Sequence, residues 1–368
     1  MDKESSLLNP LRFVKLEGVE GRPQMAELLN RAFPVPAGGC FFDDFPVWDP
    51  ARDTSTSRVA RMGVLDPEGS LLSMAAVRLA TLSAGPSSHL SVAIIGAVAT
   101  NERARGQGLA SKTVASALQW ATQQGAALAL LWGDEHSLYR KLGFELCGEQ
   151  ILAPLAFLKL PALPTGNDSE SILQLGRGWT PGLLECLRER TGGIKLNVDD
   201  EGWLAAQKNV EWYWLGPALK PRAYAAIGRG IDMENIVHEW GGEPAALQMI
   251  LSHLLVERPG SSLLGPRELF EKYDFAGAIP HAQVEYLCLA RVLDPVQVFR
   301  AHHPEVPFTA ESLAPGTWEL SFDQAKPTQA TDSELAEIFF GPNSIKAGAI
   351  PAAHWLPLPL WIWGLDAG

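Results

Sequence analysis

Cysteines and long apolar runs are both scarce in this sequence. The four cysteines lie far apart and form no Cys-x-x-Cys pair, so neither a zinc site nor a disulfide framework is indicated. No uncharged apolar stretch reaches the ~18 residues that a membrane-spanning helix needs. The first six residues have mixed charge and lead into no apolar signal region. We therefore expect a cytoplasmic protein with no metal centre and no membrane attachment.

Basic residues are also in deficit. The chain has 30 lysines and arginines against 42 aspartates and glutamates, which gives a net charge of -12. Nucleic-acid binding needs a basic face that neutralises phosphates, so nucleic acid is excluded as the main partner. An acidic chain can still bind an anion locally through backbone N–H groups and a few arginines, or attract a cationic amine. The charge alone fits an ordinary acidic protein equally well.

The length and apolar content allow several packed domains. At roughly 100 to 200 residues per domain, the 368 residues predict two or three domains. Apolar spacing predicts a mixed α/β domain over residues 1–158. Its expected strands are 11–16, 57–65, 71–82, 92–99, 126–132 and 149–155, and its expected helices are 22–33, 109–124 and a short one at 138–144. Residues 37–57 hold a cluster of aromatics and carboxylates that either lines a pocket or packs into the core.

A stretch rich in Pro, Gly, Asn and Ser at residues 160–169 is typical of a linker. Beyond it, residues 168–293 are expected to form a second domain. Its predicted helices are 180–190, 243–257 and 267–273, and its predicted strands are 210–215, 223–229, 234–240 and 283–293. The order of these elements repeats the order in the first domain.

Two short segments strengthen this internal repeat. Leu138-Tyr139-Arg140-Lys141-Leu142-Gly143-Phe144 matches Leu269-Phe270-Glu271-Lys272-Tyr273-Asp274-Phe275, which lies 131 positions further on. Each segment follows a helix and a strand. The pattern predicts two related domains in tandem. A chance similarity of two short amphipathic helices is the alternative.

Residues 294–368 form a third part, which we expect to be rich in loops. Helices are predicted at 295–302 and 333–340. The segment ends in an apolar tail that contains Trp355, Trp361 and Trp363. Because such a tail would be poorly solvated if it were free, we expect it to dock on the other two domains.

The most informative polar segment is Arg103-Ala104-Arg105-Gly106-Gln107-Gly108, which lies between a predicted strand and a predicted helix. Gly106 and Gly108 let the backbone approach a ligand closely. The free N–H groups and the dipole at the helix start favour an anion, and two arginines add positive charge. The segment is neither a Walker loop nor a dinucleotide fingerprint. It is either a pyrophosphate-binding turn or a plain structural turn.

The pattern Arg-x-x-Gly-x-Gly after a strand, followed about thirty residues later by Tyr-x-Lys-Leu-Gly-Phe, resembles the GNAT superfamily of acetyl-CoA-dependent N-acetyltransferases. The resemblance implies two tandem GNAT-like domains, each with a central mixed sheet flanked by helices, and acetyl-CoA as co-substrate. It places the pantetheine arm beside Val98, Ala99 and Thr100, and Tyr139 in the position of the general acid. Further implied coenzyme-binding residues are Arg103, Ala104, Arg105, Gly106, Gln107, Gly108, Leu109 and Ala110, and the amides around Arg103 to Gly108 would hold the pyrophosphate.

The chemistry agrees with this resemblance. An amine that attacks a thioester directly needs an acid for the departing thiolate and a base, or a water relay, for its own proton. Tyrosine suits the acid role because its pKa is close to that of a thiol. The sequence does not identify the base. Candidates near the expected site are Asp134, Glu135, His136, Asp43 and Asp44, each of which also fits a solvated or capping role.

A looser resemblance, to two-domain GNAT enzymes of the enhanced-intracellular-survival type, implies one further candidate. In those enzymes the C-terminal carboxylate enters the active site, which would assign the base to Gly368.

The second copy departs from the GNAT pattern. Its strand–helix corner contains Glu243, which would repel a pyrophosphate, and Pro244, which has no N–H. Phe270 stands where the first copy has Tyr139, and it cannot donate a proton. We therefore expect a degenerate domain without catalytic activity.

The sequence thus favours an acetyltransferase acting on a small amine, a peptide N-terminus or a lysine by direct attack in a ternary complex. The main alternative is an acyl-CoA-binding sensor or scaffold without turnover. A purely structural or interaction protein is a weaker one. The sequence does not indicate an oligomeric state.

Overall fold

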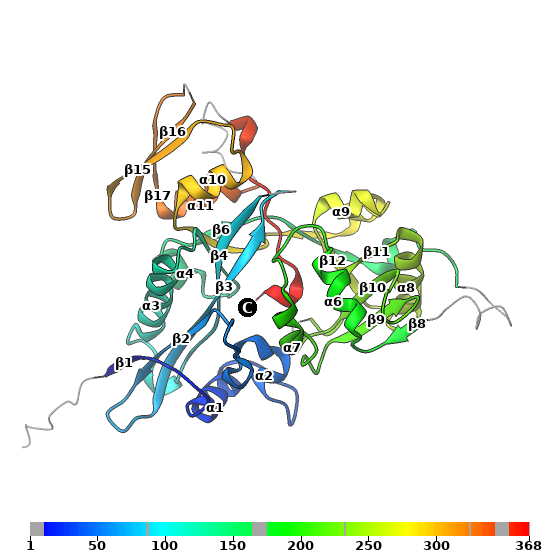
Figure 1. Ribbon diagram of the computed structural model, residues 1–368, viewed down its shortest axis with the longest axis horizontal. Coiled ribbons are helices and arrows are strands. Elements are labelled where there is room, and N and C mark those ends of the chain that lie inside the picture. The colour runs from blue at the N-terminus through cyan, green and yellow to red at the C-terminus, as the bar shows by residue number, and fades with distance from the viewer. Residues whose placement is uncertain are drawn as a thin grey trace, which may run out of the picture.

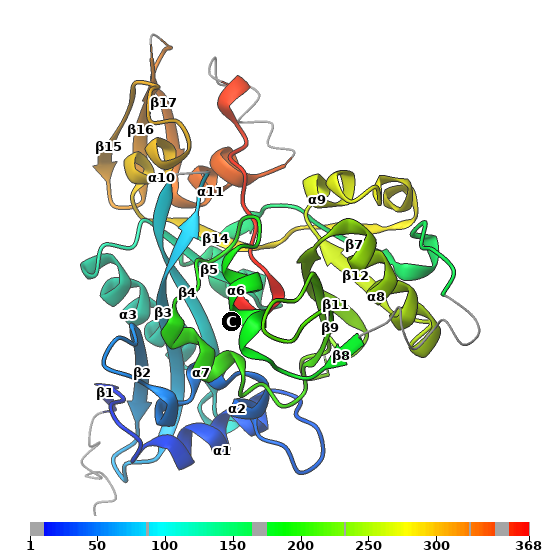
Figure 2. The same ribbon diagram turned by 45° about the vertical axis from the view of Figure 1, so that its right-hand side comes forward.

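The computed structural model describes residues 11–85, 88–163, 175–231, 233–323, 325–342 and 353–367. Figure 1 shows two α/β halves side by side, with a smaller sheet at one end. The last residues run between the two halves, and the turned view of Figure 2 shows the same arrangement. In the described part of the chain, no helix is long and apolar enough to span a membrane.

The first half is built on a sheet with two buried central strands. Its strands are β1 (Arg12–Lys15), β2 (Val59–Leu65), β3 (Leu71–Ser83), β4 (His89–Thr100), β5 (Leu128–Leu131) and β6 (Glu145–Cys147). Its helices are α1 (Arg22–Ala32), α2 (Phe41–Asp44), α3 (Leu109–Gln123) and α4 (His136–Arg140). Strands β3 and β4 are almost entirely buried, which agrees with their apolar sequences. Helix α3 packs on one face of the sheet, and α1 and α2 lie on the other.

The second half repeats this plan. Its strands are β8 (Leu175–Arg177), β9 (Glu211–Leu215), β10 (Ala223–Ile227), β11 (Ile236–Gly242), β12 (Ser262–Gly265) and β13 (Gln283–Glu285). Its helices are α6 (Pro181–Arg188), α7 (Glu201–Leu204), α8 (Pro244–Glu257) and α9 (Arg267–Lys272). The sequence analysis missed β8 and β12, which are only three and four residues long.

The two halves exchange one strand each. Strand β7 (Gln150–Pro154) lies in the second sheet, and β14 (Cys288–Val292) lies in the first. The strand orders are therefore β1-β2-β3-β4-β5-β14-β6 and β8-β9-β10-β11-β12-β7-β13, with the exchanged strand in sixth place in each. The prediction that 149–155 completes the first sheet is wrong. The predicted strand 283–293 is divided in two, and its first part, β13, lies in the second sheet as predicted, whereas its second part, β14, lies in the first. Apolar spacing shows that a segment is a strand, but it does not show which sheet the strand joins.

The closing segments of the two halves have nearly the same conformation. The rings of Tyr139 and Phe144 are 6.2 Å apart at 74°, and those of Phe270 and Phe275 are 6.4 Å apart at 74°. The Phe144 N–H donates to the Tyr139 carbonyl, and the Phe275 N–H donates to the Phe270 carbonyl. Asp274 adopts a positive φ of 62°, where the first copy has Gly143 at 80°. The structure thus confirms the repeat that the two heptapeptides predicted.

The third part contains more regular structure than expected. Helices α10 (Pro295–His302) and α11 (Asp332–Phe340) agree with the prediction. A three-stranded antiparallel sheet lies between them in the chain, formed by β15 (Phe308–Ala314), β16 (Thr317–Phe322) and β17 (Thr328–Thr331). The expectation of a loop-rich segment is therefore wrong. Only Phe308 of β15 is buried, so the strand carries no alternation of apolar and polar residues that would predict it.

The C-terminal tail is buried between the two halves. Residues 360–367 are all buried, and the indole N–H of Trp363 donates to the carbonyl of Thr191 at 3.3 Å. The ring of Trp363 stands perpendicular to that of Trp240, 5.8 Å away. One continuous apolar cluster joins side chains of both halves, the third sheet and the tail.

The aromatic segment 37–57 packs into the core. Phe41, Phe42 and Trp48 are all less than 5% exposed. Trp48 lies directly over Gly96 of β4, where an added Cβ would be 2.6 Å from the indole ring. These three side chains therefore pack into the core and do not line a pocket.

Candidate active site

Strands β4 and β5 separate at the centre of the first sheet. They pair in parallel from Val92 with Leu128 to Ile95 with Leu131, and β5 then ends. Strand β4 continues to Thr100, and β5 offers residues 96–100 no partner. A bulge lies here, because Ala76 pairs with Gly96 and Met74 with Ala99, and Ala97 has a φ of 51°. The β5-facing edge of β4 is thus available to pair with an extended ligand. Val98, Ala99 and Thr100 lie on this stretch.

A glycine turn connects β4 to α3. Gly106 and Gly108 have φ values of 77° and 70°, which favour glycine. A Cβ at either position would meet nothing within 4 Å, so the backbone at both borders open space. The first hydrogen bond of the helix runs from the Lys112 N–H to the Gly108 carbonyl. Among the described residues, the N–H groups of 106–111 have no protein acceptor.

The remaining residues of the turn divide into anchors and exposed cations. Ala104 and Leu109 are buried against Val64 and hold the turn on the sheet. Arg103 and Arg105 are exposed. The nearest carboxylate to Arg105 is that of Glu102, at 4.0 Å. The arrangement therefore combines free N–H groups at a helix N-terminus with two cations, which is suited to a pyrophosphate.

Tyr139 lies on α4, just after β5. Its side chain is 6% exposed and packs with Phe144 in the cluster under α3. Gly133 leaves room for it, since a Cβ there would be 3.1 Å from the tyrosine ring and 3.3 Å from its hydroxyl oxygen. Burial raises the pKa of Tyr139, and the nearby carboxylates of Glu135 and Asp134 raise it further. The hydroxyl therefore keeps its proton at neutral pH and can act as a proton donor.

The candidate bases have different environments. Asp43 binds Lys208 at 2.7 Å, and Asp44 accepts hydrogen bonds from Asn209 and from the Gly230 N–H. These two aspartates therefore bind the second half of the chain. Asp134 and Glu135 are exposed beside α4, and His136 begins that helix. Gly368 lies outside the described residues.

The last described residues are held by a buried charged cluster. Arg190 forms ion pairs with both Glu239 and Asp366, and Asp366 is also 3.4 Å from Arg78 of β3. The Leu365 N–H donates to Glu239 at 3.0 Å, and Arg229 donates to the carbonyl oxygens of Gly364 and Ala367. Burial raises the pKa of Glu239 to about 7, against the lowering effect of Arg190. This cluster fixes the residue that precedes Gly368.

In the second copy, the corresponding gap between strands is filled. Strands β11 and β12 pair only at Ile236 with Ser262 and Val237 with Leu263. The indole of Trp240 then bridges them, and its N–H donates to the Leu264 carbonyl at 2.7 Å. Trp240 is 1% exposed and lies among the rings of Phe270, Tyr273, Phe275 and Trp363. The Trp240 indole therefore lies between these two strands, where the first copy leaves its strand edge open.

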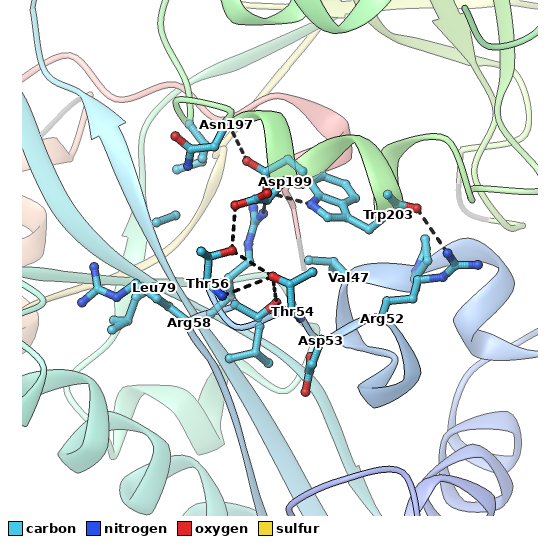
Figure 3. Close-up of a pocket in the computed structure, with 18 of the residues that line it drawn as sticks. Val47, Arg52, Asp53, Thr54, Thr56, Arg58, Leu79, Asn197, Asp199 and Trp203 are labelled. Atoms are coloured by element: carbon cyan, nitrogen blue, oxygen red, sulfur yellow. Dashed lines mark hydrogen bonds and ion pairs between the residues drawn. The ribbon is translucent and has the colours of Figure 1, made fainter. Parts of the chain in front are cut away.

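A cavity of about 340 Å³ lies between the two halves. Its floor is the Arg78–Thr81 part of β3, and its walls are the 51–59 loop and residues 194–203. Thr56 of the first half donates to Asp199 of the second at 2.7 Å, as Figure 3 shows. Arg78 is buried, lies over the Trp203 ring at 5.2 Å, and is 3.9 Å from Asp200. Hydroxyls and charges of both signs line this cavity.

Sequence reasoning missed several residues of this region. Gly133 carried a usable signal, since it is a glycine directly after a buried strand and shortly before the tyrosine segment. Nothing in the sequence around Trp240 indicates that its side chain fills the gap. Arg78, Arg190 and Asp366 come from distant parts of the chain, so their contact had no local signal.

Residues 19–147 match the family described as acetyltransferase (GNAT) domain. Among solved structures, a GCN5-related N-acetyltransferase from Kribbella flavida is similar over 99% of this chain and 100% of its own, with 14% identity and a TM-score of 0.62. One from Anabaena variabilis covers 97% and 98%, with 14% identity and a TM-score of 0.61. Eis1 from Mycobacterium abscessus covers 93% of each chain, with 16% identity and a TM-score of 0.57. No curated protein matches the sequence.

Proposed function

Since residues 19–147 form a GNAT acetyltransferase domain, we propose that this protein transfers an acetyl group from acetyl-CoA to an amine, with one working site in the first half. The observation that carries the proposal is the open gap between β4 and β5, which has the glycine turn at one end and Tyr139 beside the other. The second copy has the same fold but neither the gap nor the tyrosine.

The backbone supplies most of the coenzyme site. The N–H groups of residues 106–111, together with Arg103 and Arg105, would bind the pyrophosphate. The free edge of β4 at residues 98–100 would pair with the pantetheine arm. An N–H group at the bulge would stabilise the negative charge that develops on the thioester oxygen during attack.

The reaction then needs two proton transfers. The amine nitrogen forms a bond to the acetyl carbon, the carbon–sulfur bond breaks, and the thiolate takes a proton. We assign that proton to the hydroxyl of Tyr139, whose raised pKa keeps it protonated. The C-terminal carboxylate of Gly368 is the proposed base, because Ala367 before it is held between the halves by Arg229.

We assign the acceptor amine to the cavity between the two halves. Its floor is β3, the strand next to β4, on the sheet face opposite α3. Arg78 on this floor pairs in register with Ile94, three residues before Ala97 at the bulge. That spacing corresponds to ~10 Å along a strand.

Calorimetry with acetyl-CoA, followed by a thiol-release assay on a panel of amines, tests the proposal. The panel should contain small amines, peptides with a free N-terminus and a lysine peptide. We expect one coenzyme per chain and turnover with at least one class of amine. Binding without turnover on the whole panel would favour a coenzyme sensor. Absence of acetyl-CoA binding would rule out both activities.

A further inference from the structure

Both ends of the segment that carries Tyr139 are hydrogen-bonded to one residue of the second half, Leu287. After β5, the indole N–H of Trp132 donates to the carbonyl of Leu287 at 2.8 Å. At the other end of the segment, the N–H of Leu287 donates to the carbonyl of Cys147 in β6 at 3.0 Å. Trp132 and Cys147 flank the stretch that contains α4. Its two ends are thus fixed relative to each other through a residue that lies 155 positions after Trp132 in the chain.

Strand β14, which begins right after Leu287, pairs with the strands on both sides of the same segment. Leu289 pairs with Leu131 on one side and with Leu146 on the other. Its side chain is 2% exposed and belongs to the cluster that contains Tyr139 and Phe144. The exchanged strand therefore contacts both the backbone that carries the tyrosine and the tyrosine's own packing cluster.

We propose that Trp132 is a positioning residue for Tyr139, an inference that rests on the proposed function. In this arrangement the second copy completes the working site through Leu287 and Leu289. This gives the degenerate copy a direct role in the reaction without a catalytic group of its own. A small displacement of an acid from the atom it must protonate lowers the rate without weakening binding elsewhere. The coenzyme turn at 103–110 does not contact Trp132 through any hydrogen bond in the described chain.

Trp132→Phe removes the indole N–H and keeps an aromatic ring. We expect kcat to fall about 10-fold to 100-fold, with KM for acetyl-CoA and for the amine nearly unchanged. Trp120→Phe is the matched control. Trp120 is also half-buried in the first half, on α3, and packs on the same cluster as Tyr139. It should change neither constant. Denaturant unfolding of both variants checks that the fold is intact.

The decisive measurement repeats Trp132→Phe in a Tyr139→Phe background. If Trp132 acts by placing the tyrosine hydroxyl, the substitution has no further effect on kcat once that hydroxyl is gone. A general loss of stability would instead lower kcat by the same factor in both backgrounds. Equal factors would overturn the proposal.

A second readout does not depend on turnover. The chain has five tyrosines, and Tyr139→Phe identifies the signal of Tyr139 in ¹³C-tyrosine NMR. Burial raises the pKa of Tyr139, and the charges of Glu135 and Asp134 raise it further, so a displacement caused by Trp132→Phe should move that pKa toward its ordinary value. If no amine is acetylated but this shift occurs, the proposed function fails while the positioning role stands. An unchanged titration would overturn the positioning role.

Discussion

The two copies share a fold but differ in what occupies the space between their central strands. In the first copy, β4 and β5 separate and leave the edge of residues 96–100 free. In the second, the indole of Trp240 bridges β11 and β12 at the same level, and the tail binds at Glu239 beside it. In the second copy, the place between these two strands is thus taken by a side chain of the copy itself, and the C-terminal tail of the chain binds beside it.

This contrast separates the residues that maintain the fold from those that serve a ligand. The aromatic pair of each closing segment has the same geometry in both copies, so Phe144 and Phe275 serve packing. The Arg-x-x-Gly-x-Gly turn, and a tyrosine as the first aromatic residue of the closing segment, occur only in the first copy. A feature that is present in the first copy and absent from the second is the better candidate for a role in the reaction. The following substitutions test that rule.

Exchanging the side chains of Tyr139 and Phe270 between the two copies should give the largest effect on kcat. Tyr139→Phe gives the first copy the side chain of the second, and we expect kcat to fall about 10²-fold to 10⁴-fold because the proton donor is lost. Acetyl-CoA affinity, measured by calorimetry, should stay nearly constant. The reciprocal Phe270→Tyr should leave kcat unchanged. A comparable loss from both substitutions would break the assignment.

Opening the filled cleft should be the next largest change. Trp240→Ala removes a buried side chain and its hydrogen bond, and we expect the free energy of unfolding to fall by about 3–5 kcal/mol. Trp214→Ala is the control, because its half-buried indole also donates to a carbonyl, that of Gly178. Denaturant titrations compare the two. Similar losses would mean that Trp240 has no special part in the second copy.

The charged group beside the filled cleft should make stability depend on pH. The pKa of Glu239 is about 7 in the folded chain and lower when unfolded, so its protonated form favours folding. Its contribution is complete below the unfolded pKa and is lost as the pH rises through about 7, by roughly 3 kcal/mol at most. Glu239→Gln should flatten this part of the profile, measured as unfolding midpoints from pH 4.5 to 8. Parallel profiles would contradict the buried-carboxyl interpretation.

Two glycines, Gly133 just after β5 and Gly265 at the end of β12, should give the smallest effects, with different readouts. Gly265→Ala places a Cβ 2.6 Å from the Trp240 ring, and we expect about 1–3 kcal/mol of destabilisation. Gly133→Ala places one 3.1 Å from the Tyr139 ring, which can yield by a few tenths of an ångström. It should cost less than about 1 kcal/mol of stability. It should mainly lower kcat. Unfolding and rate measurements on both variants test this. The comparison fails if Gly133→Ala mainly lowers stability and Gly265→Ala mainly lowers kcat.

Local features of the chain predicted much of the fold. Helices α1, α3, α8, α10 and α11 begin and end within two residues of their predicted bounds, since apolar spacing is a local signal. Helices α1, α8 and α10 also have a proline in the first turn. Strands β8 and β12 were missed because three or four residues carry too little pattern. The sheet of β15, β16 and β17 was missed because its strands expose many polar positions.

The sequence by itself determined the glycine turn at 106 and 108, the tyrosine at 139 and the tandem repeat, because each depends on neighbouring residues. The sequence also predicted that the apolar tail docks on the two halves. The tertiary structure alone decided the exchange of β7 and β14 and the place at Arg190 where the tail binds. It also decided that Trp240 fills the second cleft. These features depend on contacts between residues far apart in the chain, and the free energy of such contacts is set by the packing of the whole core rather than by any local pattern.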